Sequence, residues 1–167
     1  MTDTVLTDTV LTDTVPTDIA LTDIALTDTA LTADAAATGS RALIERAYRA
    51  FHDRDVAALL DTLDPRVEWV HPDGMAEYGL GGTKHGHAGV REFLAKVPSV
   101  LGGMRLRPQE FVAAGDRVVV FGVREVTSKR GTTVTLPFIH SWTLRGGRAV
   151  RMEDVFDTVL FRRVIES

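Results

Sequence analysis

The segment from Phe138 to Phe156 constrains the fold more than any other part of this chain. Apolar and polar residues alternate on both sides of a central Arg-Gly-Gly-Arg, residues 145–148. This alternation predicts two half-buried strands, and the glycine pair predicts a tight turn between them. The segment is therefore expected to form an antiparallel hairpin.

The length of the turn decides which residues of this hairpin face each other. A two-residue Gly-Gly loop would pair Leu144 with Ala149 and would set His140 opposite Glu153. A three-residue loop shifts the pairing by one residue and sets His140 opposite Asp154. Register follows the choice that makes each face uniform, which favours the three-residue loop. The resulting inward face carries Leu136, Phe138, His140, Trp142, Val150, Met152, Asp154 and Phe156.

His140 and Asp154 thus lie side by side on an apolar, aromatic surface. A buried carboxylate needs a partner or a raised pKa, and His140 can be the partner. A buried pair that only fixes the register would look the same in sequence. Its position on the concave face of a sheet favours a functional site, in which desolvation makes Asp154 a stronger base than it is in water.

The remaining elements define the fold class. Helices are predicted after Ser40 and Asp55, both N-cap candidates, and over about 89–97, with Pro65 ending the second helix. A glycine-rich loop is predicted over 74–88. Helices followed by an antiparallel meander indicate an α+β fold with the helices packed on one curved sheet. The predicted strands are 67–71, 104–113, 117–127, 132–144 and 148–157.

The N-terminal region has a different composition. Residues 2–31 are six pentapeptides of the type TDTVL or TDIAL, and residues 1–40 contain seven aspartates and no Lys or Arg. A period of five matches neither a helix face nor a strand face. We therefore predict that residues 1–39 are a disordered acidic tail and that residues 40–167 are the folded domain.

Charge and composition exclude several classes of function. The formal net charge of −4 becomes +3 once the tail's seven aspartates are removed, since −4 + 7 = +3, so no footprint for nucleic acid is expected. Neither a signal peptide nor a membrane span is expected. The chain has no cysteine, which is compatible with the cytoplasmic location that we expect.

Further candidate residues come from the first strand and the loop after it. Trp69 and His71 are two positions apart and share one face of the predicted strand, and Tyr78 follows in the loop. His85 and His87 have the spacing of a metal clip, but no third ligand accompanies them, so no metal site is predicted.

With these elements in this order, the chain resembles the SnoaL-like polyketide cyclases of the nuclear transport factor 2-like superfamily. The resemblance covers about residues 41–160 and is strongest over FIHSWTLRGGRAVRMEDVFDT, residues 138–158. It implies a cone-shaped, mostly antiparallel sheet wrapped around three N-terminal helices, with an internal apolar pocket. It also implies a homodimer formed through the outer face of the sheet.

The resemblance further implies an intramolecular aldol ring closure on a polyketide-type substrate, without a metal or organic cofactor. Asp154 matches the family's acid/base residue and His140 its partner fourteen residues earlier. The substrate is expected to be small and hydrophobic. The residues expected to line its pocket are Trp69, His71, Tyr78, Arg124, Phe138, Trp142, Met152 and Phe156.

Three alternatives remain open at this level. An epoxide hydrolase on this fold needs a second acid, which would be Glu125 if Glu125 rather than Arg124 faces the pocket. A ketosteroid isomerase places a base carboxylate where this chain has His71. A non-catalytic ligand-binding or dimerisation module would have no need of a His–Asp pair.

Overall fold

The computed structural model describes residues 19–167, with side chains from residue 30 onward. The chain divides into two units, the second of which runs from Ala33 to Ser167. The second unit contains the sheet, the shorter helices and the C-terminal part of the first helix. It is the part of the protein that carries the site described below.

The first helix, α1 (Ile19–His52), starts well before the predicted N-cap, so Ser40 does not cap it. Alanine and leucine recur from residue 20 onward without a proline, which favours a helix despite the five-residue repeat. The Ser40 hydroxyl instead donates a hydrogen bond of 2.8 Å to the carbonyl of Gly115. Residues 1–18 lie outside the described residues, and a separate tail over residues 1–39 stays a prediction.

The next two helices lie close to their predicted positions. Asp55 caps α2 (Val56–Asp61) by accepting a hydrogen bond of 2.9 Å from the Ala58 amide, as predicted. Pro65 does not end this helix, because the chain has already entered a strand at Leu63. The third helix, α3 (Gly86–Val100), is longer than predicted at both ends and includes Pro98.

Six strands form one sheet in the order β2-β1-β6-β5-β4-β3. The last four strands match the sequence prediction within two residues at each end. Neighbouring strands from β3 to β6 are antiparallel, and β1 lies parallel to β6. The four strands are β3 (Gly103–Ala114), β4 (Arg117–Thr127), β5 (Thr133–Arg145) and β6 (Arg148–Phe156).

The glycine-rich segment contains more structure than predicted. After β1 (Leu63–His71) it forms a short 3₁₀ helix, η1 (Asp73–Tyr78), and then β2 (Gly82–His85), which pairs antiparallel with β1. Gly79 ends η1 with a φ of 73°, a conformation that glycine adopts without strain. This turn returns the chain to the edge of the sheet.

The β5–β6 hairpin has the predicted register, but it has a two-residue turn and a β-bulge instead of the predicted three-residue turn. Gly146 and Gly147 form a two-residue loop with φ of 56° and 73°, and Leu144 pairs with Ala149. A β-bulge then shifts the register between Thr143 and Leu144. Beyond the bulge the predicted pairs are present: Trp142 with Met152, His140 with Asp154 and Phe138 with Phe156.

A C-terminal helix, α4 (Thr158–Glu166), was not predicted. Asp157 caps it by accepting a hydrogen bond of 2.9 Å from the Leu160 amide. Its buried residues, Phe161 and Val164, complete an apolar core between the sheet and the helices.

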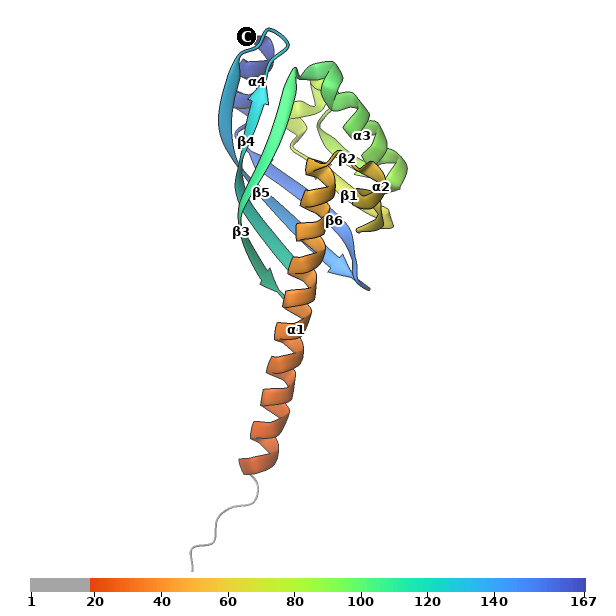
Figure 1. The fold of residues 1–167 in the computed structure, drawn as a ribbon, viewed down its shortest axis with the longest axis vertical. Coiled ribbons are helices and arrows are strands. Elements are labelled where there is room, and N and C mark those ends of the chain that lie inside the picture. Colours follow the sequence, from red (N-terminus) through yellow and green to blue (C-terminus); the bar gives the residue numbers. More distant parts are fainter. Residues whose placement is uncertain (1–18) are drawn as a thin grey trace, which may run out of the picture. The chain divides into compact units, whose positions relative to one another are not determined.

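The second unit is therefore an α+β fold with a curved and mostly antiparallel sheet, as predicted, and the sheet does not close into a barrel. Figure 1 shows the strands curving around the space that faces the helices. Among the described residues, no helix combines the length and hydrophobicity needed to span a membrane.

Candidate active site

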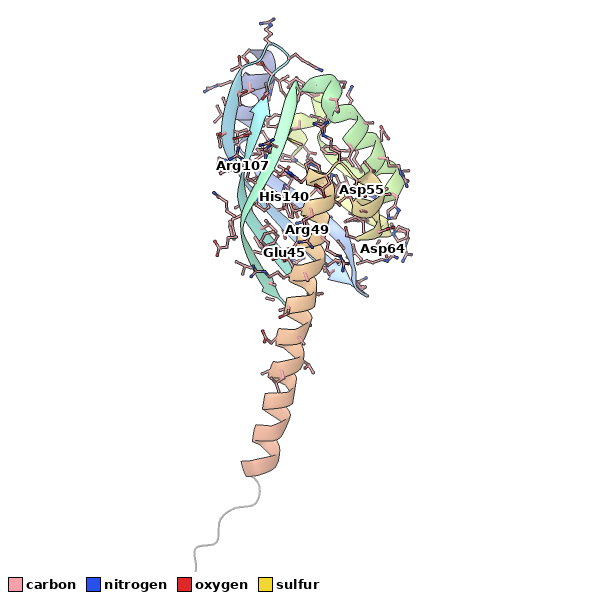
Figure 2. All side chains as sticks on the ribbon, in the orientation of Figure 1. Glu45, Arg49, Asp55, Asp64, Arg107 and His140 are labelled. Carbon is pink, nitrogen blue, oxygen red and sulfur yellow. The ribbon has the colours of Figure 1, made fainter. Side chains whose placement is uncertain are left out.

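A cavity of about 50 Å³ lies on the concave side of the sheet. Apolar and aromatic side chains form most of its lining, and the ionisable side chains that line it are Tyr48, His71, Arg124, His140 and Asp154. They come from α1 and from strands β1, β4, β5 and β6. In Figure 2, His140 lies between the sheet and α1. A second hollow of about 530 Å³ adjoins the cavity, since Tyr48, Phe51 and Leu59 line both.

Asp154 and Arg124 form the charged centre of the cavity wall. The Arg124 guanidinium donates two hydrogen bonds to the carboxylate: Nη1 contacts Oδ2 at 3.0 Å and Nη2 contacts Oδ1. Both residues are only 3% exposed. The guanidinium carbon lies 4.3 Å from the centre of the Phe156 ring and 5.1 Å from that of Phe138. These aromatic faces compensate part of the cost of burying a cation.

His140 connects this pair to α1. Its Nε2 lies 3.1 Å from Oδ1 of Asp154, and its Nδ1 lies 2.5 Å from the Tyr48 hydroxyl. Because an ionised carboxylate only accepts hydrogen bonds, Nε2 carries the hydrogen, and Nδ1 then accepts from Tyr48. Burial keeps the pKa of His140 below its ordinary value, so the ring is neutral at neutral pH.

His71 faces the same carboxylate from β1. Its Nε2 is 3.6 Å from Oδ2 of Asp154, and its ring stacks on Phe93 with 4.0 Å between ring centres. Burial lowers the pKa of His71 to about 3, against the opposing influence of Asp154. Two neutral imidazoles therefore flank one carboxylate.

The electrostatics of Asp154 differ from the sequence expectation. Burial alone favours the neutral acid, but His140 and the Arg124 guanidinium together outweigh it. The pKa of Asp154 thus lies well below its usual range, and the carboxylate is not the strengthened base that was expected. The lowering comes from His140 first and from Arg124 second, and the inward orientation of Arg124 was left open by the sequence.

The burial of the side chains of β4 shows that Arg124, and not Glu125, faces the cavity. Arg124 is buried, while Glu125 forms an ion pair of 2.7 Å with Arg107 and is not among the residues that line the cavity. Asp154 is the one carboxylate among the described residues of the lining. The second acid that an epoxide hydrolase would need is therefore missing from this wall.

Most of the predicted pocket residues do line the cavity. Trp69, His71, Arg124, Trp142, Met152 and Phe156 are all part of its wall, together with His140 and Asp154. Two predicted residues are not. Phe138 lies behind the wall, with its ring 4.4 Å from that of His140. Tyr78 was expected in the pocket, but its hydroxyl donates a hydrogen bond of 2.6 Å to Glu166 of α4 instead.

Sequence reasoning missed two important contacts, Tyr48 and Phe93. Both lie on the apolar faces of helices, where aromatic residues usually mean core packing. Their role in the site follows from two contacts: the Tyr48 hydroxyl hydrogen-bonds to Nδ1 of His140, and the Phe93 ring stacks on His71.

No metal site competes with this arrangement in the part of the chain that the structure describes. No group of three or more His, Cys, Asp or Glu residues there is arranged to hold a metal ion. His87 contacts the Leu63 carbonyl at 3.2 Å, and His85 is exposed.

A curved sheet closed by helices over an apolar cavity defines a protein of the nuclear transport factor 2-like class. Within it, the SnoaL-like domain family matches residues 44–152, and the chain belongs to this family. No functionally curated protein matches the chain.

Solved structures agree with this assignment. TerC, co-crystallised with polyporic acid, is 64% identical, with 77% of this chain and 99% of that chain covered and a TM-score of 0.76. A protein of unknown function from Burkholderia pseudomallei, described as NTF2-like, is 47% identical, with coverage of 77% and 98% and a TM-score of 0.75. A putative SnoaL-like polyketide cyclase from Jannaschia sp. CCS1, at 16% identity, coverage of 78% and 93% and a TM-score of 0.67, shares the fold.

Proposed function

We propose that this chain is an enzyme of secondary metabolism that moves protons on a polyketide-type substrate, in the manner needed for intramolecular aldol ring closure. Such a closure requires a base for a C–H next to a carbonyl and a donor for the enolate oxygen. The family implies that this chemistry runs without a metal or organic cofactor.

One observation carries the proposal: a buried network of Tyr48, His140, Asp154 and Arg124 lines an otherwise apolar cavity. Replacing buried charges by apolar residues of similar volume is often neutral or stabilising. A module that only binds an apolar ligand gains little from such a network, whereas an acid/base enzyme depends on it. This argument favours catalysis over the binding-module alternative.

The substrate class is suggested by TerC, whose structure contains polyporic acid. That compound is a flat hydroxylated quinone with aryl substituents, and its hydroxyl groups are enolic. The cavity of this chain offers aromatic walls and an arginine, which suit the same chemistry. The adjoining hollow of about 530 Å³ leaves room for the remainder of a larger substrate.

Within this proposal, Asp154 and His140 are the central pair. Both oxygens of Asp154 are engaged by Arg124, so we assign the carboxylate the role of charge partner. It stabilises positive charge that forms beside it during the reaction. His140 holds the carboxylate in place and is itself held by Tyr48.

The test uses the two tryptophans of the chain, Trp69 and Trp142, which both line the cavity. Titration with polyporic acid should quench their fluorescence. Turnover is measured with a linear polyketide methyl ester in D₂O, by following ring closure and deuterium uptake by mass spectrometry.

The deciding variant is His140→Gln, with exposed His85→Gln as its control. His140→Gln should bind polyporic acid within a few-fold of the wild type while losing about 10²-fold in turnover, because the carboxylate is no longer held in place. Full turnover by His140→Gln would contradict the assigned role. Binding by the wild type without ring closure or deuterium uptake would instead support a binding module.

A further inference from the structure

Four buried side-chain atoms in the described part of the chain have no hydrogen-bond partner: Nε1 of Trp69, Nδ1 of His71, Nε of Arg124 and Nε1 of Trp142. All four side chains line the same cavity. An unsatisfied buried polar group costs about 1–3 kcal/mol, so such groups are rarely gathered in one place without a reason. Trp142 also interacts with the Tyr48 oxygen, so the argument rests on the other three.

His71 is the one acceptor among these three. Its Nε2 lies 3.6 Å from Oδ2 of the ionised Asp154, a placement that favours the tautomer with the ring hydrogen on Nε2. The lone pair is then on Nδ1, the atom without a partner. The separation of 3.6 Å is longer than a hydrogen bond, but such contacts often shorten when substrate binds.

Asp154 is the neighbouring charge that favours a proton on His71. Asp154 on β6 attracts a proton to the ring, while His140 on β5, Arg124 on β4 and Lys84 on β2 oppose it. Burial has the largest influence and keeps the ring neutral and free to accept. A negative oxygen formed in the cavity would add to the attraction of Asp154 and stabilise the imidazolium.

We propose that His71, through Nδ1, accepts the substrate's proton, and that Nε1–H of Trp69 and Nε–H of Arg124 bind the oxygen on which negative charge then develops. The substrate is an enolisable carbonyl compound, either a β-dicarbonyl or a hydroxyquinone. The C–H or enolic O–H bond breaks and its proton moves to Nδ1. The electron pair remains on the substrate as an enolate, and Asp154 stabilises the resulting imidazolium.

The two donors fit this role by position. Trp69 precedes His71 by two residues on β1 and shares its face, with 6.1 Å between the two ring centres. Both terminal nitrogens of Arg124 hydrogen-bond to Asp154, whereas its buried Nε–H has no partner. This inference rests on the proposed function, because it names the proton acceptor for that reaction.

Nitrogen-15 NMR of the histidine rings tests the acceptor directly, with His71→Gln used to assign the signals. At neutral pH, His71 should be neutral with its hydrogen on Nε2. Addition of polyporic acid, which is an anion at neutral pH, should protonate Nδ1, because the ring takes up a proton from solvent beside the bound negative oxygen. A hydrogen on Nδ1 in the free protein, or an unchanged ring when the ligand is bound, would overturn the proposal.

Variants separate this inference from the proposed function. Trp69→Phe keeps the aromatic surface but removes the N–H, and it should weaken polyporic acid binding about tenfold, whereas Trp142→Phe should have a smaller effect. On the ring-closing substrate, His71→Gln should lower kcat about 10²–10⁴-fold with KM little changed, and His85→Gln should not. Full turnover by His71→Gln would refute the role of His71 alone. Absence of turnover in the wild type would refute the proposed function, while the NMR result would still decide whether His71 accepts the proton.

Discussion

Arg124 reaches across β5 to hold Asp154 with two hydrogen bonds, so that a cation on β4 and an anion on β6 form one buried pair. The Phe138 ring on the intervening strand packs against the guanidinium of Arg124. A pair of this kind is expensive to break from one side, because the remaining charge stays buried without compensation.

Removing one partner should therefore destabilise the fold strongly. Arg124→Leu and Asp154→Leu should each lower the free energy of unfolding by about 3–5 kcal/mol. The double variant should cost clearly less than the sum, because it leaves no isolated charge. Urea unfolding of the wild type and the three variants measures this. Additive losses would mean that the two side chains are not coupled.

The same pair shows how far sequence reasoning could go. The facing of His140 and Asp154 followed from strand alternation, since only one register gives a uniform inward face. The inward turn of Arg124 could not be derived that way, because an arginine in a strand usually faces solvent. Its burial depends on three partners, Asp154, Phe138 and Phe156, that come from two other strands.

Two other differences have local causes. The turn between β5 and β6 was predicted as a three-residue loop, whereas the structure has a two-residue loop followed by a β-bulge. Both arrangements shift the register by one residue, so the sequence pattern does not distinguish them. Helix α4 was missed although Asp157 is a good N-cap and Leu160, Phe161 and Val164 follow at helical spacing. The contacts of Tyr48 depend on how closely α1 approaches the sheet, which no single-chain pattern reveals.

Gly122 should be hard to replace. A Cβ at this position would lie 2.5 Å from the Arg107 carbonyl oxygen and 2.7 Å from the Phe138 ring, closer than real contacts allow. Gly122→Ala should cost about 1–3 kcal/mol of stability and disturb the ring that supports Arg124. Gly103→Ala, whose Cβ would meet Thr127 at an ordinary 3.7 Å, is the matched control. Equal thermal stability of the two variants would contradict the prediction.

Deleting residues 1–38 should leave the folded domain intact. Residues 30–36 are exposed, and among the described side chains of α1, which start at residue 30, the first that belongs to the core is Leu43. The deletion also keeps the Ser40 hydrogen bond to Gly115. We expect the melting temperature to change by less than about 2 °C. A fall of several degrees would show that the segment contributes to the stability of the domain.

The outer face of the sheet should form a homodimer interface. Phe121, Ile139 and Val155 are directly paired neighbours on β4, β5 and β6, with exposures of 39%, 39% and 51%. A row of exposed apolar side chains across three strands is unusual for a monomer. Sedimentation velocity should show a dimer at micromolar concentration and a monomer for Ile139→Lys. Val159→Lys, on an equally apolar but isolated exposed position of α4, should remain dimeric.

Acid should destabilise the domain from about pH 6.5 downward, well before its carboxylates titrate. Burial lowers the pKa of both His71 and His140 in the folded state, to about 3 for His71. Below pH 6.5 these histidines are therefore protonated in the unfolded chain but remain neutral in the native state. Because the unfolded state binds more protons, the free energy of unfolding falls as pH falls. Each histidine contributes a slope approaching about 1.4 kcal/mol per pH unit. Asp154, whose pKa is depressed in the folded state, adds its own loss only below its unfolded value of about 3.9.

The histidine contribution can be isolated by urea unfolding at several values between pH 7.5 and pH 4.5. His71→Gln should reduce the slope of the free energy of unfolding against pH by up to about 1.4 kcal/mol per pH unit, which corresponds to one proton, because one of the two neutral imidazoles is gone. His85→Gln, which replaces an exposed histidine on β2, should leave the slope unchanged. A stability that stays flat down to pH 4.5 would mean that His71 and His140 bind protons in the native state as readily as in the unfolded chain, so that burial does not lower their pKa values. A stability that instead rises as the pH falls would mean that both rings are preferentially protonated in the native state, and the neutral acceptor on which the proposed chemistry depends would then not exist at neutral pH.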